Sequence, residues 1–428
     1  MSGRFVRGGR PLPLREQAAV RDRWLSERLR LLLPGLMDDA GLDAWVVVAR
    51  EYAEDPVLAS LLPASGLSAR RRTVLAFRRT SDGVEGRSLT RYPVGDYAPA
   101  WDADAGSQHE ALRALLDSWD PARIGVDVSE VLAHADGLTH TEHRLLVDAL
   151  GPLAQRLVPA QDLVVAWLGT RLPEQVEAAH ELNRLAHEVI AQAFSADAVV
   201  PGTTTADDLA WWIRQRFHDL GVEPWFHPSV LTQRAGAPLL DERGLPTGGV
   251  PVDAPVEAGD LLHCDVGLTS LDLRTDTQRN AYVLRPGETG APAGLRASLR
   301  TGNRMQDLTT AALRPGRTGD EVLAAARTAA AAEGVDGDVY SHPVGHHGHG
   351  AGPAIGLWDA QDGVPGTGAL VVGADTLWAL ELCVRTPVPE WGGQVVRMAL
   401  EQGVVVRDDG VEYLDARQTD LLLVRPPT

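Results

Sequence analysis

The hydrophobic and polar positions in the first third of the chain change repeatedly between two periods. Stretches with apolar residues at helical spacing alternate with short apolar runs typical of strands, and turns rich in Pro, Gly or Asp separate them. The helical stretches are residues 18–33, 102–117 and 139–149, and the strand-like runs are 44–49, 73–77 and 123–128. This alternation predicts a small α/β domain, which we place at residues 1–165.

After this domain the pattern changes to long helices followed mostly by strands. Helical spacing extends over residues 174–196 and 203–220, and a segment rich in Gly and Pro follows. Strand-like segments then dominate to the C-terminus, interrupted by helical stretches at 293–313 and 318–333. The pattern predicts a second domain over residues 166–428 and an α+β class for the chain.

Composition and charge exclude several kinds of partner and chemistry. The 428-residue chain has a formal net charge of −18, which disfavours binding to nucleic acid or to anionic membrane surfaces. It contains no lysine, so pyridoxal enzymes and P-loop NTPases, which depend on a lysine, are excluded. Residues 1–13 lack the apolar run of a secretory signal, and no apolar segment is long enough to span a bilayer. We therefore expect a cytoplasmic protein, in which the two cysteines are small buried hydrophobes.

Two aspartates stand in adjacent strand-like segments. Residues 261–267 and 273–277 predict two strands joined near Ser270, and antiparallel pairing about that point would place Asp265 opposite Asp276. Two carboxylates at such a short distance repel one another unless a positive charge lies between them. A divalent cation would supply that charge, although a solvated Asp-rich hairpin is the simpler alternative for this pair alone.

Histidines and glutamates farther along the chain add candidate ligands for such a cation. Residues 341–350 carry four histidines in a glycine-rich segment, where imidazole nitrogens can reach a metal unless the segment is only a solvated loop. Glu381 and Glu401 lie in apolar strand-like stretches, at 377–384 and 395–406, where a buried charge needs a partner. Carboxylates with an imidazole form a hard, oxygen-rich set that suits paired Mn²⁺, Co²⁺, Zn²⁺ or Fe²⁺.

The order of these residues resembles the pita-bread metallopeptidase family, which includes methionine aminopeptidase, aminopeptidase P, prolidase and creatinase. The matching features are an Asp, a second Asp eleven residues later, a His within His-x-x-Gly-His, and two Glu. The likeness covers roughly residue 168 to the C-terminus, and the preceding α/β domain resembles the N-terminal domain of the creatinase and prolidase branch. The resemblance implies a pita-bread domain that hydrolyses Xaa-Pro bonds in a peptide or dipeptide, in a homodimer or homotetramer.

The resemblance also implies a set of metal ligands. Asp265 would bind one ion, Asp276 and Glu401 would bridge two ions, and His346 with Glu381 would complete the second site. Manganese is the expected metal, with cobalt, zinc or iron as alternatives.

A mechanism follows from such a centre. The two ions would share a water, lower its pKa and polarise the scissile carbonyl, and the resulting hydroxide would attack. Glu381 would relay the proton to the leaving nitrogen, and His227 or His342 would hydrogen-bond the developing oxyanion.

Three departures from the family pattern concern the substrate pocket rather than the ligands. Leu382 stands where the family usually has Pro, and Pro353 where it often has a histidine, a space that His349 or Trp358 could fill. Arg397 precedes the last glutamate by four residues rather than two. Two alternatives to a peptidase therefore stay open, a non-peptidase C–N hydrolase on the creatinase-type fold and a catalytically inactive binding protein. Retention of all five ligand types favours the metal peptidase.

Overall fold

The computed structural model describes residues 3–237 and 249–425, which form two compact units. One unit runs from Pro13 to Leu172, and the other combines the described residues up to Leu12 with those from Pro173 onward. The expected boundary between residues 165 and 166 falls inside helix α5 (Gln161–Gly169), before the observed one. In the described part of the chain, no helix combines the length and the apolar character needed to cross a membrane.

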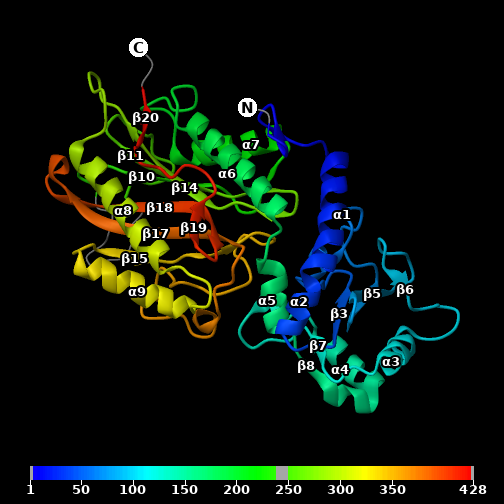
Figure 1. Ribbon diagram of the computed structural model, residues 1–428. Helices are drawn as coiled ribbons and strands as arrows, with labels where there is room; N and C mark the ends of the chain where they lie inside the picture. The colour runs from blue at the N-terminus through cyan, green and yellow to red at the C-terminus, as the bar shows by residue number, and fades with distance from the viewer. Residues whose placement is uncertain (1–2, 238–248, 426–428) are drawn as a thin grey trace. The chain divides into compact units, whose positions relative to one another are not determined.

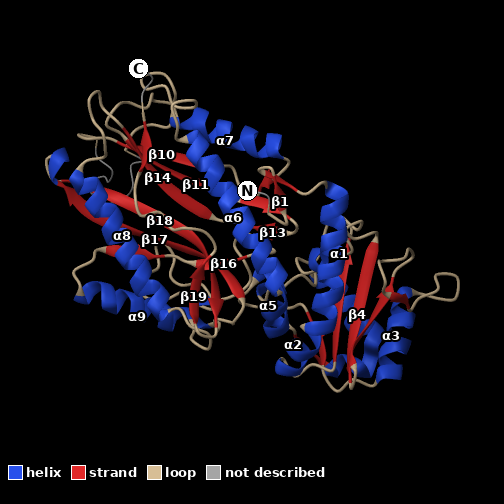
Figure 2. Cartoon of the chain, turned by 45° about the horizontal axis from the view of Figure 1, so that its top comes forward, coloured by secondary structure: helices blue, strands red, loops and turns tan. Residues whose placement is uncertain are grey.

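The first residues of the chain belong with the second unit because a helix of that unit binds their backbone. Glu181 on α6 (Pro173–Ala193) accepts hydrogen bonds of 2.6–2.8 Å from three consecutive backbone N–H groups, those of residues 4–6. Strands β1 (Val6–Arg7) and β2 (Arg10–Pro11) follow as a small hairpin (Figure 2). Hydrophobic periodicity could not reveal this attachment, because polar contacts make it: besides the hydrogen bonds to Glu181, Arg4 forms ion pairs with Glu174 and Glu177 of the same helix.

The N-terminal unit is a six-stranded sheet with helices on both faces (Figure 1). In the spatial order of the sheet, its strands are β6 (Ala98–Pro99), β5 (Gly83–Leu89), β4 (Arg72–Thr80), β3 (Ala44–Arg50), β7 (Ile124–Val126) and β8 (Leu157–Pro159). Besides α5, its helices are α1 (Leu14–Leu31), α2 (Leu33–Asp39), α3 (Gln108–Trp119) and α4 (His140–Leu150). Val46 of β3 lies in one core with residues of α3 and α4, whereas Trp45 on the opposite face contacts Trp167 of α5. Coverage of both faces explains why β3 is a continuous apolar run.

The second unit contains a nine-stranded sheet and a separate, small three-stranded sheet. The strands of the main path are, in spatial order, β10 (Ser229–Gln233), β11 (Leu261–Val266), β14 (Thr277–Val283), β18 (Gln394–Arg407), β17 (Thr376–Val388) and β15 (Gly337–Val339). The further strands of this sheet are β16 (His342–Val344), β19 (Gly410–Tyr413) and β20 (Leu422–Val424). The small sheet consists of β13 (Leu273–Arg274), β12 (Leu268–Ser270) and β9 (Glu223–Pro224). Besides α6, the helices are α7 (Ala206–Leu220), α8 (Ala293–Ala312) and α9 (Gly319–Ala332).

The two longest strands separate a hydrophobic face from a polar face. β17 and β18 pair antiparallel, with Glu381 directly opposite Glu401. Even-numbered residues of these strands, such as Leu382 and Leu400, lie in the main core with residues of α8 and α9 (Figure 1). Odd-numbered residues point to the other face, where Val405 packs with residues of α6. The two glutamates therefore lie on the face that α8 and α9 do not cover.

Candidate metal centre

The register between the two aspartate-bearing segments differs from the expected hairpin. Asp265 on β11 pairs with Gln278 on β14 and not with Asp276, which lies one residue before β14 begins. The connection continues as the short pair β12–β13, closed by a turn in which Leu271 and Asp272 have φ values of 56° and 58°. The turn lies about one residue later than expected, so the register shifts by two residues. Because a shift of two leaves every side chain on its own face, Asp276 is a diagonal neighbour of Asp265.

Four polar residues form one row across four neighbouring strands. In order across β11, β14, β18 and β17, the directly paired residues of the row are Asp265, Gln278, Glu401 and Glu381. Directly paired residues share a face, with Cβ atoms roughly 5 Å apart. Strand pairing thus gathers three carboxylates from distant parts of the chain, and Asp276 adds a fourth at the end of β14.

Ligand atoms of these carboxylates form three overlapping groups, two of which include histidines. Within each group the atoms lie within 4.8 Å of one another, and the groups are Asp265–Asp276–Glu401, His342–Glu381–Glu401 and Asp276–His342–His349. Asp276 and Glu401 each belong to the all-carboxylate group and to a group that contains histidine. Asp276 and Glu401 are therefore the carboxylates that link the all-carboxylate group to the groups with histidine.

Burial makes this concentration of acid costly unless a positive charge is present. Oδ1 of Asp265, Oδ1 of Asp276 and both carboxylate oxygens of Glu401 are buried and accept no hydrogen bond from any residue that the structure describes. Burial raises the pKa of Asp265 to about 7, and burial together with the charge of Asp265 raises the pKa of Glu381 to about 8. The pKa values of Asp276 and Glu401 are raised well above the usual range, first by burial and then by the neighbouring carboxylates. Buried oxygens without a donor are ligands suited to a divalent cation, so the residues present fit a metal centre.

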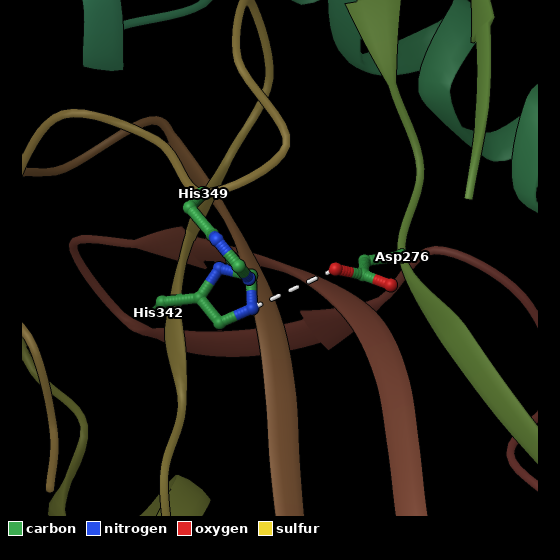
Figure 3. Close-up of side chains that lie close together, drawn as sticks. All are labelled: Asp276, His342 and His349. Atoms are coloured by element: carbon green, nitrogen blue, oxygen red, sulfur yellow. Dashed lines mark ion pairs between the residues drawn. The ribbon is translucent and has the colours of Figure 1, made fainter. Parts of the chain in front are cut away.

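Two histidines of the glycine-rich segment, His342 and His349, lie close to Asp276 (Figure 3). Nε2 of His342 lies 3.6 Å from Oδ2 of Asp276 and 3.9 Å from Oε1 of Glu401. The ring of His349 packs edge-on against that of His342, with centroids 4.7 Å apart. Burial lowers the pKa of His342 to about 4, so its imidazole is neutral near pH 7 and retains a lone pair for a metal ion.

Two of the expected site residues lie elsewhere. His346 contributes to none of the ligand groups in the described part of the chain, and its ring lies against that of His347 with centroids 5.0 Å apart. His227 is exposed before β10, and its ring contacts Trp211 and approaches Arg214, both on α7. Four of the five expected ligands thus come together, and the imidazoles grouped with them in the described part of the chain are those of His342 and His349.

The path of the glycine-rich segment explains why His349, and not His346, lies beside His342. The backbone N–H of Gly350 donates to the carbonyl of Pro343 at 2.7 Å, and that of Gly345 donates to the carbonyl of His347 at 2.9 Å. The segment therefore folds back on itself and returns His349 to His342, with His346 in the middle of the loop. Spacing along the sequence cannot identify the inward imidazole here, because the segment is neither a helix nor a long strand.

Gln278 is a member of the site that was not expected from the sequence. Its amide Nε2 donates to Oε1 of Glu381 at 2.5 Å and to Oδ2 of Asp265 at 3.3 Å. Strand alternation could have identified it, since the residue two positions after Asp276 shares its face.

Arg397 acts on the same carboxylates despite its departure from the family spacing. Its separation of four residues from Glu401 is even, so both side chains lie on one face of β18. Its Nη2 donates to the hydroxyl of Tyr340 at 2.6 Å. The guanidinium charge opposes the effect of burial on the pKa of Glu381, which places a basic group beside the carboxylates.

Residues 174–406, more than half of the chain, match the family model of metallopeptidase family M24. The chain belongs to metallopeptidase family M24. No curated protein matches the sequence.

Solved structures share the fold over nearly the whole chain. The X-Pro aminopeptidase from Thermotoga maritima MSB8 has a TM-score of 0.63 at 15% identity, covering 91% of this chain and 100% of that one. The Xaa-Pro dipeptidase from Bacillus anthracis has a TM-score of 0.62 at 15% identity, covering 95% of this chain and 99% of that one. The prolidase from Pyrococcus furiosus has a TM-score of 0.56 at 15% identity, covering 90% of this chain and 99% of that one. These findings confirm the predicted family and the pita-bread fold with its N-terminal domain.

Proposed function

We propose that this chain is a dinuclear metal-dependent peptidase that hydrolyses Xaa-Pro bonds. The observation that carries the dinuclear part is the membership of Asp276 and Glu401 in two different ligand groups, one with Asp265 and one with histidine. Two cations at adjacent positions would also neutralise the four carboxylates, three of which have buried oxygens without a donor among the described residues. The names of the similar solved structures support the Xaa-Pro part, and at 15% identity they support it as an expectation.

The ligand assignment follows the three groups. Asp265 would hold the first ion, Asp276 and Glu401 would contact both ions, and Glu381 with His342 would hold the second. His349 would complete the second site beside His342 in place of His346. Four carboxylates make the donor set hard, which favours Mn²⁺, with Co²⁺, Zn²⁺ or Fe²⁺ as alternatives.

Bound divalent ions would supply a water of lowered pKa and polarise the scissile carbonyl. Glu381 is less deeply buried than Glu401, so its carboxylate is placed to pass a proton to the leaving nitrogen. We assign His342 to the metal rather than to the expected oxyanion role, because its Nδ1–H donates to the carbonyl of Pro343 at 2.9 Å and its Nε2, which faces Asp276, carries the lone pair. We propose His227 only as a contact for the substrate. It lies in the loop before β10, and the first residue of β10, Ser229, pairs with Asp265 on β11.

A matched pair of peptides tests the specificity. Metal-loaded protein should cleave Xaa-Pro substrates roughly ten- to two-hundredfold faster, in kcat/KM, than Xaa-Ala analogues, because losing one ring from an apolar pocket changes discrimination by about 1–3 kcal/mol. Dipeptides and longer peptides with Xaa-Pro at the N-terminus should be assayed in parallel, with Asp276→Ala as the inactive control. Hydrolysis of another amide or C–N bond, without cleavage of Xaa-Pro at any length, would remove the peptidase assignment and leave the metal centre standing.

A further inference from the structure

Gln278 connects two carboxylates that belong to different ligand groups. Its Nε2 donates to Oδ2 of Asp265, a member of the all-carboxylate group, and to Oε1 of Glu381, a member of a group with histidine. The side chain of Gln278 is only 3% exposed, so water does not readily replace either hydrogen bond. An amide has two N–H groups, and both are directed at carboxylates here.

A buried histidine fixes which end of the amide faces the carboxylates. Nε2 of His263 lies 2.9 Å from Oε1 of Gln278, and His263 is 6% exposed. Carboxylates that hold a metal ion are ionised and only accept hydrogen bonds, so Nε2 of the amide faces them and Oε1 faces His263. The imidazole therefore donates through its Nε2–H. The result is a directed chain of hydrogen bonds from His263 through Gln278 to both carboxylates.

These hydrogen bonds determine which carboxylate oxygens remain available to a cation. The amide occupies Oδ2 of Asp265, whereas Oδ1 of the same carboxylate is buried and accepts no hydrogen bond from any described residue. A carboxylate held by one oxygen presents the other in a fixed direction, and partners of this kind orient metal ligands and tune their affinity.

We propose that Gln278, oriented by His263, is a positioning residue that ties the outer ligand of one metal ion to the outer ligand of the other and thereby sets the affinity of both. This inference rests on the proposed metal centre and not on the Xaa-Pro specificity. A consequence is that loss of the amide weakens both binding steps together, whereas loss of a ligand belonging to one group acts mainly on one step.

The first test replaces the amide without changing the length of the side chain. Gln278→Met removes the two N–H donors, and calorimetric titration of the metal-free protein with Mn²⁺ should show both dissociation constants raised roughly ten- to a hundredfold. With Co²⁺, the absorption bands of the saturated variant should shift, because both outer carboxylates change orientation; lost fold stability alone would not shift them. Gln402→Ala is the matched control, since Gln402, on the neighbouring strand β18, is another buried amide, and its oxygen accepts a hydrogen bond from Arg279 on the other face; this variant should leave the Co²⁺ bands unchanged.

Two results of this titration would overturn the proposal. Unchanged dissociation constants would show that the carboxylates do not need the amide. Tighter binding in Gln278→Met would show that the amide occupies space that a cation needs and hinders binding.

The second test addresses His263 and provides a rescue. His263→Leu removes the donor to Oε1 of Gln278 and should weaken both Mn²⁺ binding steps, by less than Gln278→Met does. His263→Gln keeps an N–H at the position of the imidazole Nε2 and should restore most of the affinity. If both variants weaken binding equally, His263 acts by its bulk and the directed chain is wrong; the circular dichroism of each metal-free variant verifies that it is folded.

Discussion

Each of the two units buries a cluster of carboxyl groups, and the two clusters differ in what neutralises them. In the N-terminal unit, Asp55 and Asp127 are each 1% exposed. Asp127 accepts a hydrogen bond from Nε1 of Trp45 at 2.8 Å, and Asp55 accepts one from the backbone N–H of Val57 at 2.9 Å. Burial raises the pKa of Asp55 to about 6 and that of Asp127 well above its usual range. One retained proton and two donors therefore suffice for this pair.

The carboxylate cluster of the second unit, formed by the row and Asp276, has twice as many acids, and the amide of Gln278 donates hydrogen bonds to two of them. Among them, Glu401 has two buried oxygens without a hydrogen bond from any described residue. Imidazoles lie within ligand distance of this cluster, whereas Asp55 and Asp127 belong to no group of three potential ligands in the described part of the chain. The difference teaches that burial of carboxylates alone does not indicate a metal centre. A metal centre is indicated when several buried carboxylates lack hydrogen-bond donors and imidazoles lie next to them.

Removal of a shared carboxylate should produce the largest effect. Asp276→Ala or Glu401→Ala removes a carboxylate that we propose contacts both metal ions, and the remaining carboxylates then repel one another. We expect loss of both metal ions and hydrolysis at background level, measured by elemental analysis and peptide cleavage. Asp127→Asn is the matched control from the other cluster and should retain full metal content. Two ions retained in either alanine variant would contradict the assignment.

Removal of the metal should make stability fall with rising pH. The pKa values of Asp265 and Glu381 in the folded chain, about 7 and about 8, lie above the value near 4 of an unfolded carboxyl group. The metal-free fold thus binds more protons than the unfolded chain. The contribution of these two groups to the free energy of unfolding is therefore complete below about pH 4 and is lost as pH rises through 7 to 8. A tenfold difference in proton affinity corresponds to about 1.4 kcal/mol, so the loss is of the order of 4–5 kcal/mol for each group.

Thermal unfolding between pH 5.5 and 8.5, with and without Mn²⁺, measures this effect. The separation between the two unfolding temperatures should widen steadily toward pH 8.5. If the separation stays constant over this range, metal binding does not displace protons from these carboxylates, and the prediction is wrong.

The histidines sharpen the comparison at the level of single ligands. His349→Ala should weaken Mn²⁺ binding roughly ten- to a hundredfold at one of the two sites, because His349 lies in a ligand group with Asp276 and His342. His346→Ala should change binding less, since its ring lies against His347 instead. This order reverses the expectation from the sequence motif. Titration calorimetry of the two variants decides between them, and a greater loss in His346→Ala would restore the motif-based assignment.

The smallest effect is expected from the N-terminal pair. Asp127→Asn keeps an acceptor for Trp45 and removes one of two adjacent buried carboxyl groups. Burial and Asp55 raise the pKa of Asp127 well above that of an unfolded carboxyl group, which costs the natural chain stability as pH rises above about 4. The variant should therefore be about 1–3 kcal/mol more stable than the natural chain above pH 7, and the difference should shrink toward pH 4. Chemical unfolding at the two pH values checks this. Equal stability of the two proteins above pH 7 would mean that the pair is not coupled.

The sequence predicted the elements of the site better than its register. Strand character around Glu381 and Glu401 was visible because alternation places apolar residues such as Leu382 and Leu400 in the core and leaves the glutamates on the other face. The pairing of Asp265 was misplaced by two residues. The turn that sets it consists of Leu271 and Asp272 at positive φ, which a Leu-Asp pair does not signal as Asn-Gly would.

The glycine-rich segment shows a second limit. Four histidines stand within eight positions, and backbone hydrogen bonds within the segment decide which imidazole meets the carboxylates. Such bonds have no periodicity. Gln278 escaped notice for another reason, since a neutral amide among acids has no place in a ligand motif, although its face was predictable from Asp276.

The metal content of the purified chain tests the central claim most directly. The protein should be dialysed to remove metal, titrated with Mn²⁺ at pH 8 and analysed for bound manganese per chain. We expect two bound manganese ions per natural chain, and we expect Glu401→Ala to lose both. Saturation at one ion or fewer per natural chain, with the fold intact, would contradict a dinuclear centre held in common by Asp276 and Glu401.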